Sequence, residues 1–261
     1  MASFVPGKML AAGCVLASMF TTLAATLALA AIMAVPAQAA ERALAHVVGY
    51  SGDGRYFAFE EFGVQDGSGF AYSTYYVIDL NEDRWVVGTP IAQVGESEDE
   101  TLAAIRAAAA EAASPRLGNL GIDVPAFFVA GFGDGVLDTD AHQLAFGLPR
   151  FAAPGSVIGR YVLDLEIFGA DAASPCLDWF GASAKGFVAH LSDGGPALEV
   201  HRDGVLPRSR GCPEDYRIYG IYVPFEANDM ARGVALISYY PHGFEGLDRR
   251  FLALPLAPGG L

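Results

Sequence analysis

Apolar residues divide the chain into two regions with different patterns. Residues Met9–Val35 form an alanine-rich apolar run without a charged side chain. From residue 46 onward, short apolar stretches alternate with polar positions, and residues that favour turns separate them. The first pattern is typical of a secretory signal or a membrane span, and the second of β-strands with a buried face.

The first region has the layout of a signal peptide. Lys8 supplies a basic start, the apolar run follows, and Ala37-Gln38-Ala39 forms a small-residue processing site. We therefore expect residues 1–39 to be removed on export to a bacterial periplasm or beyond. An uncleaved membrane anchor is the alternative, because the run is long enough to span a bilayer.

The second region, residues 40–261, predicts a single mainly β domain of antiparallel sandwich or propeller-like sheets. Its candidate strands lie about 10–20 residues apart with turn signals between them, a spacing that disfavours βαβ units. The predicted strands are His46–Tyr50, Tyr56–Phe62, Thr74–Leu80, Trp85–Val87, Gln143–Gly147, Gly159–Phe168, Gly186–Leu191, Ala197–His201, Tyr216–Val223, Val234–Tyr240 and Arg250–Leu256.

One segment changes to a helical period. Ser97 and Glu100 have the spacing of a capping box, in which each side chain caps a main-chain N–H of the first turn. Ser114-Pro115 favours a stop, because proline disfavours helical geometry in the residue before it. The prediction is a helix over Glu98–Ala113, whose apolar face carries Leu102, Ile105, Ala109 and Ala112.

Two cysteines remain after removal of the signal peptide, which would take Cys14 with it. In an exported protein, Cys176 and Cys212 predict one disulfide bond. Each stands next to a proline, so each is expected in an extended or turning segment. Gly211 lets the chain bend toward the bond.

Charge limits the classes of partner. The chain has 16 Lys and Arg against 30 Asp and Glu, a formal net charge of −14. Such a surface repels phosphate backbones and anionic lipid, so we expect no nucleic acid and, after cleavage, no membrane as a partner. An envelope protein or a glycan remains as the expected partner.

Two stretches resemble known families. Ser51–Phe59 followed by Tyr76–Leu80 resembles one blade of the Tol-type β-propellers, with Gly52 where that repeat has proline. The wider chain resembles the predicted secreted bacterial proteins of the family called domain of unknown function 2259. That resemblance rests on Asp53–Gly69, Leu206–Pro213 and Gly243–Phe251. It implies export and a single unit, and it carries over no catalytic residue.

Motifs for catalysis or metal binding are not recognisable. Gly49–Asp53 and Gly181–Lys185 both lack the last glycine of a serine nucleophile elbow. The acidic loop of Asp134, Asp138, Asp140 and His142 does not have the spacing of a calcium loop. We therefore predict no catalytic residue, no metal and no cofactor.

Two similar hairpins supply the candidate ligand site. Ala58–Leu80 and Ala235–Leu256 each join two strands through a loop with glycine and acidic residues. If the hairpins pack together, their loops share an edge, where aromatic and charged groups suit a sugar or a peptide. The candidate ligand-binding residues are Glu60, Glu61, Asp66, Tyr72, Glu245, Asp248, Arg249 and Arg250.

The same residues allow two other interpretations. Arg249 or Arg250 could pair with the acids only to hold the loops together. Alternatively, loop carboxylates could serve a carbohydrate-active hydrolase, although Glu60 and Glu61 are adjacent and must face opposite sides of a strand. We favour a non-enzymatic binding or scaffolding module, with the hydrolase as the alternative.

The processing site gives a direct prediction. Cleavage is expected after Ala39 or Ala40, because the small residues of the site end there. Intact-mass measurement of the exported protein would read this out. A mass that retains Met9–Val35 would instead identify a membrane anchor.

Overall fold

The computed structural model describes Met1 and residues 40–133, 140–150 and 152–257 of the 261-residue chain. Residues Ala39–Leu261 form one compact unit. The predicted signal peptide lies outside the described residues. Among the residues that are described, no helix is both long enough and apolar enough to cross a membrane.

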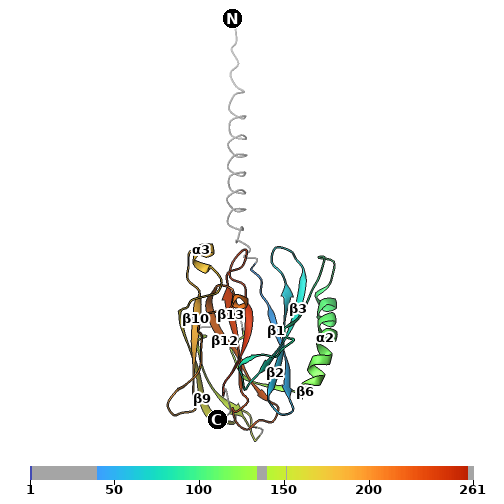
Figure 1. The fold of residues 1–261 in the computed structure, drawn as a ribbon. Coiled ribbons are helices and arrows are strands. Elements are labelled where there is room, and N and C mark those ends of the chain that lie inside the picture. The colour runs from blue at the N-terminus through green and yellow to red at the C-terminus, as the bar shows by residue number, and fades with distance from the viewer. Residues whose placement is uncertain (2–39, 134–139, 151, 258–261) are drawn as a thin grey trace. The chain divides into compact units, whose positions relative to one another are not determined.

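Three antiparallel sheets build this unit, and the prediction of a mainly β fold is confirmed (Figure 1). The first, called here the helix-covered sheet, has the order β4-β3-β2-β1-β6, with β5 also paired to β3. Its strands are β1 (Leu44–Ser51), β2 (Tyr56–Val64), β3 (Ala71–Asp79), β4 (Arg84–Trp85), β5 (Ile91–Val94) and β6 (Ile122–Val124).

The other two sheets have four strands each. The middle sheet has the order β14-β13-β12-β7, with β7 (Ala126–Ala130), β12 (Pro213–Pro224), β13 (Val234–Pro241) and β14 (Arg250–Pro255). The far sheet has the order β11-β10-β9-β8, with β8 (Gln143–Pro149), β9 (Val157–Gly169), β10 (Lys185–Ser192) and β11 (Leu198–Arg202).

The middle sheet is packed on both faces. Every residue of β13 is buried, which explains why its sequence is almost entirely apolar, apart from Ser238, and does not alternate. Val234 and Leu236 belong to the core shared with the helix-covered sheet, and Ala235 and Ile237 to the core shared with the far sheet. The sheets are therefore stacked in three layers, which is a sandwich arrangement and not a ring of propeller blades.

The two similar hairpins do pack against each other. One is β2 with β3 and the other is β13 with β14, so they lie in adjacent layers. Phe57 and Phe59 of the first hairpin share a core with Leu236 and Phe251 of the second. This packing brings their connecting segments to a common edge.

Helix α2 covers the outer face of the helix-covered sheet, but its predicted bounds were wrong. It runs over Leu102–Asn119, and the Thr101 hydroxyl accepts a hydrogen bond from the Ala104 N–H as its N-cap. Glu100 accepts from the nearby Glu96 N–H instead of completing a capping box. Pro115 is exposed and lies inside the helix, where the main-chain carbonyl it leaves unpaired can be hydrated.

The buried face of α2 also differs by one position. Ile105, Ala109 and Ala113 are buried at a spacing of four residues, whereas Ala112 is exposed. Ala109 and Ala113 pack against Tyr75 of β3. A face of small residues lets the helix lie close to the sheet. Because the helix covers one face of the strands, the opposite face points toward the middle sheet.

The disulfide prediction is confirmed. Cys176 and Cys212 are bonded, with their Cα atoms 5.5 Å apart. Cys176 begins the short helix α3 (Cys176–Phe180), so the extended segment expected there is a helical turn instead. Gly211 has φ +66°, a conformation that favours glycine, and it ends the 3₁₀ helix η1 (Arg208–Arg210).

Candidate functional site

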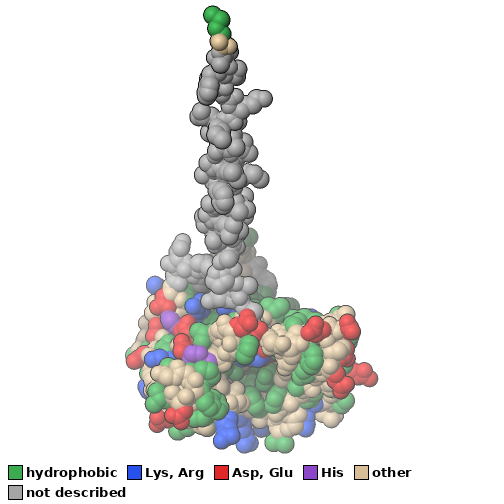
Figure 2. All heavy atoms as spheres, turned by 90° about the horizontal axis from the view of Figure 1, so that it is seen from above, with side chains coloured by type: hydrophobic (Ala, Val, Ile, Leu, Met, Phe, Trp, Pro, Cys, Tyr) green, Lys and Arg blue, Asp and Glu red, His purple; other side chains and the backbone are tan. Residues whose placement is uncertain are grey.

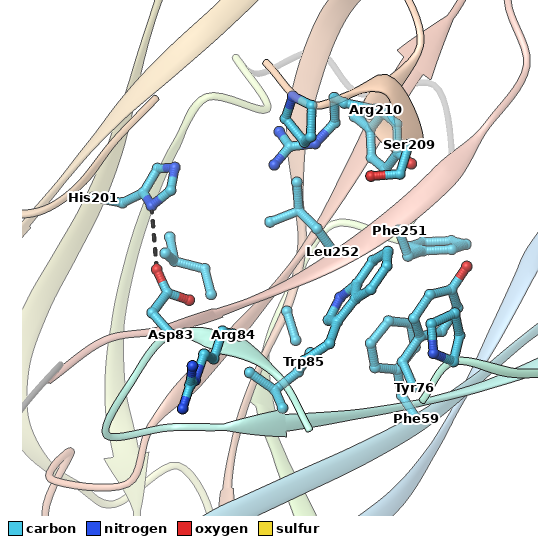
Figure 3. A pocket seen from close by; sticks show the side chains of 16 residues that line it. Phe59, Tyr76, Asp83, Arg84, Trp85, His201, Ser209, Arg210, Phe251 and Leu252 are labelled. Atoms are coloured by element: carbon cyan, nitrogen blue, oxygen red, sulfur yellow. Dashed lines mark ion pairs between the residues drawn. The ribbon is translucent and has the colours of Figure 1, made fainter. Parts of the chain in front are cut away.

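A groove opens where edge strands of all three sheets meet. It is lined by β3 and β4 of the helix-covered sheet, by β14 of the middle sheet, and by His201 of β11 in the far sheet. Figure 3 shows these side chains converging from separate elements, with the η1 segment along one side. This main cavity has a volume of about 590 Å³.

A second cavity continues the first. It has a volume of about 380 Å³ and shares Tyr76, Ser209, Arg210 and Tyr239 with it. Because four residues line both, we treat the two as one feature and call it the edge groove. Its size is within the range of sites that hold small ligands.

An aromatic stack forms one wall of the edge groove. The Phe59 and Tyr76 rings stack at 4.9 Å between centroids, with 12° between their planes. Trp85 follows at 5.5 Å from Tyr76 and remains 45% exposed. Phe59 is buried in the core, so the stack holds the partly exposed indole at a fixed position.

A charged histidine joins two layers at this edge. His201 Nε2 lies 3.1 Å from Asp203 Oδ1, and its Nδ1 lies 3.5 Å from Asp83 Oδ2 in the turn before β4. Burial opposes the charge, but the hydrogen bonds with Asp203 and Asp83 outweigh it and raise the pKa of His201 to about 9. The imidazolium thereby ties the far sheet to the helix-covered sheet.

The η1 segment forms the opposite wall. Arg210 donates to the Tyr216 hydroxyl at 3.3 Å and lies 3.6 Å from Asp203. Arg208 is exposed, and its guanidinium has no ion-pair or hydrogen-bond partner in the part of the chain that the structure describes. Cys212 lies two residues after Arg210, so the disulfide anchors the segment that carries both arginines.

The smaller cavity contains four of the residues predicted from the sequence: Glu61, Tyr72, Asp248 and Arg250. Arg250 donates to the Tyr72 hydroxyl at 2.8 Å and lies 3.4 Å from Glu61 Oε1. Glu61 Oε2 accepts the Phe251 N–H at 2.8 Å. Desolvation by burial raises the pKa of Glu61 to about 7, although Arg250 opposes the shift.

The remaining predicted residues lie elsewhere or at the margin. Glu60 faces the opposite side of β2, where Arg106 of α2 binds both of its oxygens at 2.8 and 2.7 Å.

The other predicted residues also lie outside the two cavities or beside them. Arg249 is buried and donates to the Ala43 carbonyl at 2.7 Å. Glu245 is exposed in the loop before β14. Burial is the main cause that raises the pKa of Asp248, and the charge of nearby Asp66 adds a smaller contribution.

The sequence did not point to the other half of the groove. Trp85, His201, Arg208 and Arg210 line it but were not predicted as site residues. Their positions depend on how three sheet edges align, which no local pattern encodes. The Arg-Ser-Arg sequence before a half-cystine was the one local signal that could have drawn attention to η1.

Among the described residues, no group of three or more His, Cys, Asp or Glu side chains is arranged so that it could hold a metal ion. Asp140 lies beside His142 and accepts its main-chain N–H at 2.9 Å. Asp134 and Asp138 lie outside the described residues.

Comparison with known proteins identifies the family. The profile of the family described as "Predicted secreted protein (DUF2259)" matches residues 58–257, which is most of the chain. The chain belongs to this family. The match covers almost all of the described strands and supports export of the DUF2259 protein. No curated protein and no solved structure matches it.

The His201 contacts predict a pH dependence of stability. Below pH 6.5 the His201 imidazole is protonated in both the folded and the unfolded chain. Between pH 6.5 and about 9 it is protonated only in the folded chain. This contribution to the free energy of unfolding is therefore lost as pH rises through that window, by about 3 kcal/mol at most. Urea unfolding between pH 6 and 10 measures it.

His201→Gln should flatten this part of the profile, whereas His190→Gln on β10 should leave it in place, because His190 lies 3.9 Å from its carboxylate partner and outside the groove. An unchanged slope in His201→Gln would show that this histidine does not link the layers.

Proposed function

We propose that this DUF2259 protein is an exported, non-enzymatic binding module of the bacterial cell envelope, and that the edge groove is its ligand site. The observation that carries the proposal is the partly exposed Trp85, held by a buried aromatic stack in an open cavity of about 590 Å³. Aromatic surface beside a few fixed polar groups is the usual composition of a small-ligand site.

The state of the acids in the groove favours binding over catalysis. Both oxygens of Glu61 are engaged, one by Arg250 and one by the Phe251 N–H, and its side chain is 4% exposed. Asp248 accepts the Glu41 N–H at 3.0 Å. Carboxylates fixed in this way organise the connecting segments of the two hairpins, and they are poorly placed to approach a bond in a substrate.

The start of the folded unit supports removal of the signal peptide. Glu41, at most two residues after the predicted cleavage site, is already buried and pairs with Arg250. Cleavage there would place a new amino terminus beside Asp248, whose carboxylate gains a positive neighbour. Glu41, the first or second residue of the processed chain, would thus remain part of the packed domain after cleavage.

One observation favours the hydrolase as a second candidate. A carboxyl group with a pKa near 7 in a sugar-sized cavity has the property of a general acid in glycosidases, and Glu61 fits this description. The binding account predicts no release of reducing ends from envelope glycans by the exported protein. Release that Glu61→Gln abolishes, with Glu245→Gln as the exposed control, would establish the hydrolase instead.

The two tryptophans of the chain allow a matched test of the ligand site. Trp85 lines the edge groove, whereas Trp179 is 63% exposed on α3 and lines neither cavity. Exported protein is screened on an array of envelope glycans. A glycan that binds is then titrated into the protein while the intrinsic tryptophan fluorescence is recorded. We expect the emission change to persist in Trp179→Phe and to disappear in Trp85→Phe.

Trp85→Ala should weaken binding at least about tenfold, because loss of a stacked aromatic contact costs on the order of 1.4 kcal/mol or more. Binding that survives Trp85→Ala unchanged would place the ligand outside the groove.

A further inference from the structure

The charge balance of the edge groove is opposite to that of the protein. The chain as a whole has 30 acidic against 16 basic residues. Figure 2 shows acidic side chains spread along the rim on both sides of one face, in keeping with that excess. The groove, in contrast, is lined by four arginines and three carboxylates. The arginines are Arg84, Arg208, Arg210 and Arg250.

Two of the three carboxylates of the groove pair with a cation, and the third, Asp248, accepts the Glu41 N–H. Asp83 pairs with the His201 imidazolium, and Glu61 with Arg250. Arg208 has no such partner among the described residues, and Arg84 pairs only with the exposed Glu82. The Arg208 guanidinium therefore supplies positive charge at the groove surface that no neighbouring carboxylate among the described residues offsets.

The η1 arginines and Trp85 lie on different walls. Arg208 and Arg210 belong to η1, and Trp85 follows Arg84 on β4. Figure 3 shows the Trp85 indole between Arg84 at one end of the view and Arg210 at the other. A ligand with a flat apolar face and anionic groups at its edge would meet both kinds of surface at once.

The edge of β14 disfavours a peptide that adds as a further strand. Phe251 turns its N–H outward to Glu61, so the alternation of an antiparallel ladder also points the Ala253 N–H outward. The next outward position is Pro255, which has no N–H. One remaining donor is too few for strand addition, which relies on a row of main-chain hydrogen bonds.

We infer that the edge groove binds an anionic oligosaccharide, with one sugar ring on Trp85 in the larger cavity and a carboxylate of the same chain on the arginines of η1. This rests on the proposed function and names the ligand class of the same site. Arg208 supplies the guanidinium that is free to form a two-pronged contact with a carboxylate. Arg210, already held against the Tyr239 ring with its guanidinium carbon 5.3 Å from the centroid, is pre-positioned beside it.

The test uses a pair of probes that differ only in charge. The exported protein is titrated calorimetrically with trigalacturonate and with its fully methyl-esterified form, which keeps the rings and removes the carboxylates. We expect the acid to bind at least about tenfold more tightly at low salt, and the difference to shrink as salt screens the charges. An ester that binds as well as the acid, or no binding of either, overturns the inference.

Two arginine variants make the result specific. Arg208→Gln should remove most of the preference for the acid, whereas Arg202→Gln should keep it, because Arg202 lies on β11 outside the groove and pairs with Glu199. An undiminished preference in Arg208→Gln also overturns the inference.

The proposed function can fail separately. If the ester binds and Trp85→Ala abolishes its binding, the groove is a ligand site and the anionic ligand class is wrong. If a glycan from the array binds without dependence on Trp85, the groove itself is the wrong site.

Discussion

Burial of the middle sheet on both faces is the constraint on which the rest of the structure depends. β13 has no exposed residue, and its alternate side chains fill two separate cores. A sheet in this position needs a layer on each side, because an exposed face of the same residues would leave apolar surface in water. The helix-covered sheet and the far sheet supply those layers.

Stacking three sheets also decides where polar chemistry can occur. The interiors between layers are apolar, so charged groups gather where the strand edges meet. There the His201 imidazolium joins Asp203 of the far sheet's edge to Asp83 of the helix-covered sheet. The edge groove follows from the same geometry, since β14 ends the middle sheet beneath this bridge.

Most of the fold could be predicted from the sequence, because its strands carry local signals. Val234–Tyr240 reads as a strand and forms β13, and Tyr56–Phe62 forms most of β2. β5, β6 and β7 were missed, since they are short segments beside loops whose strand character comes from pairing with distant partners. The helix was found, but its ends were not, because packing against β3 outweighs the cost of Pro115.

The candidate site was predictable only in part, and for a similar reason. Glu61, Tyr72, Asp248 and Arg250 were brought together by assuming that two similar hairpins pack, and they do. The aromatic wall lies at strand ends, and the η1 arginines lie in a turn that the disulfide anchors. These segments come together only because of the order in which the layers stack, and residue spacing along the chain does not predict that order.

The central claim is that ligand binds in the edge groove, and hydrogen–deuterium exchange of the exported protein with and without a bound glycan tests it most directly. The account predicts slower exchange at residues 83–85 around β4 and at 207–211 around η1, which line the groove. Exchange at β6, β7 and β8, away from the groove, should not change. Protection confined to those strands or to α3 would contradict the account.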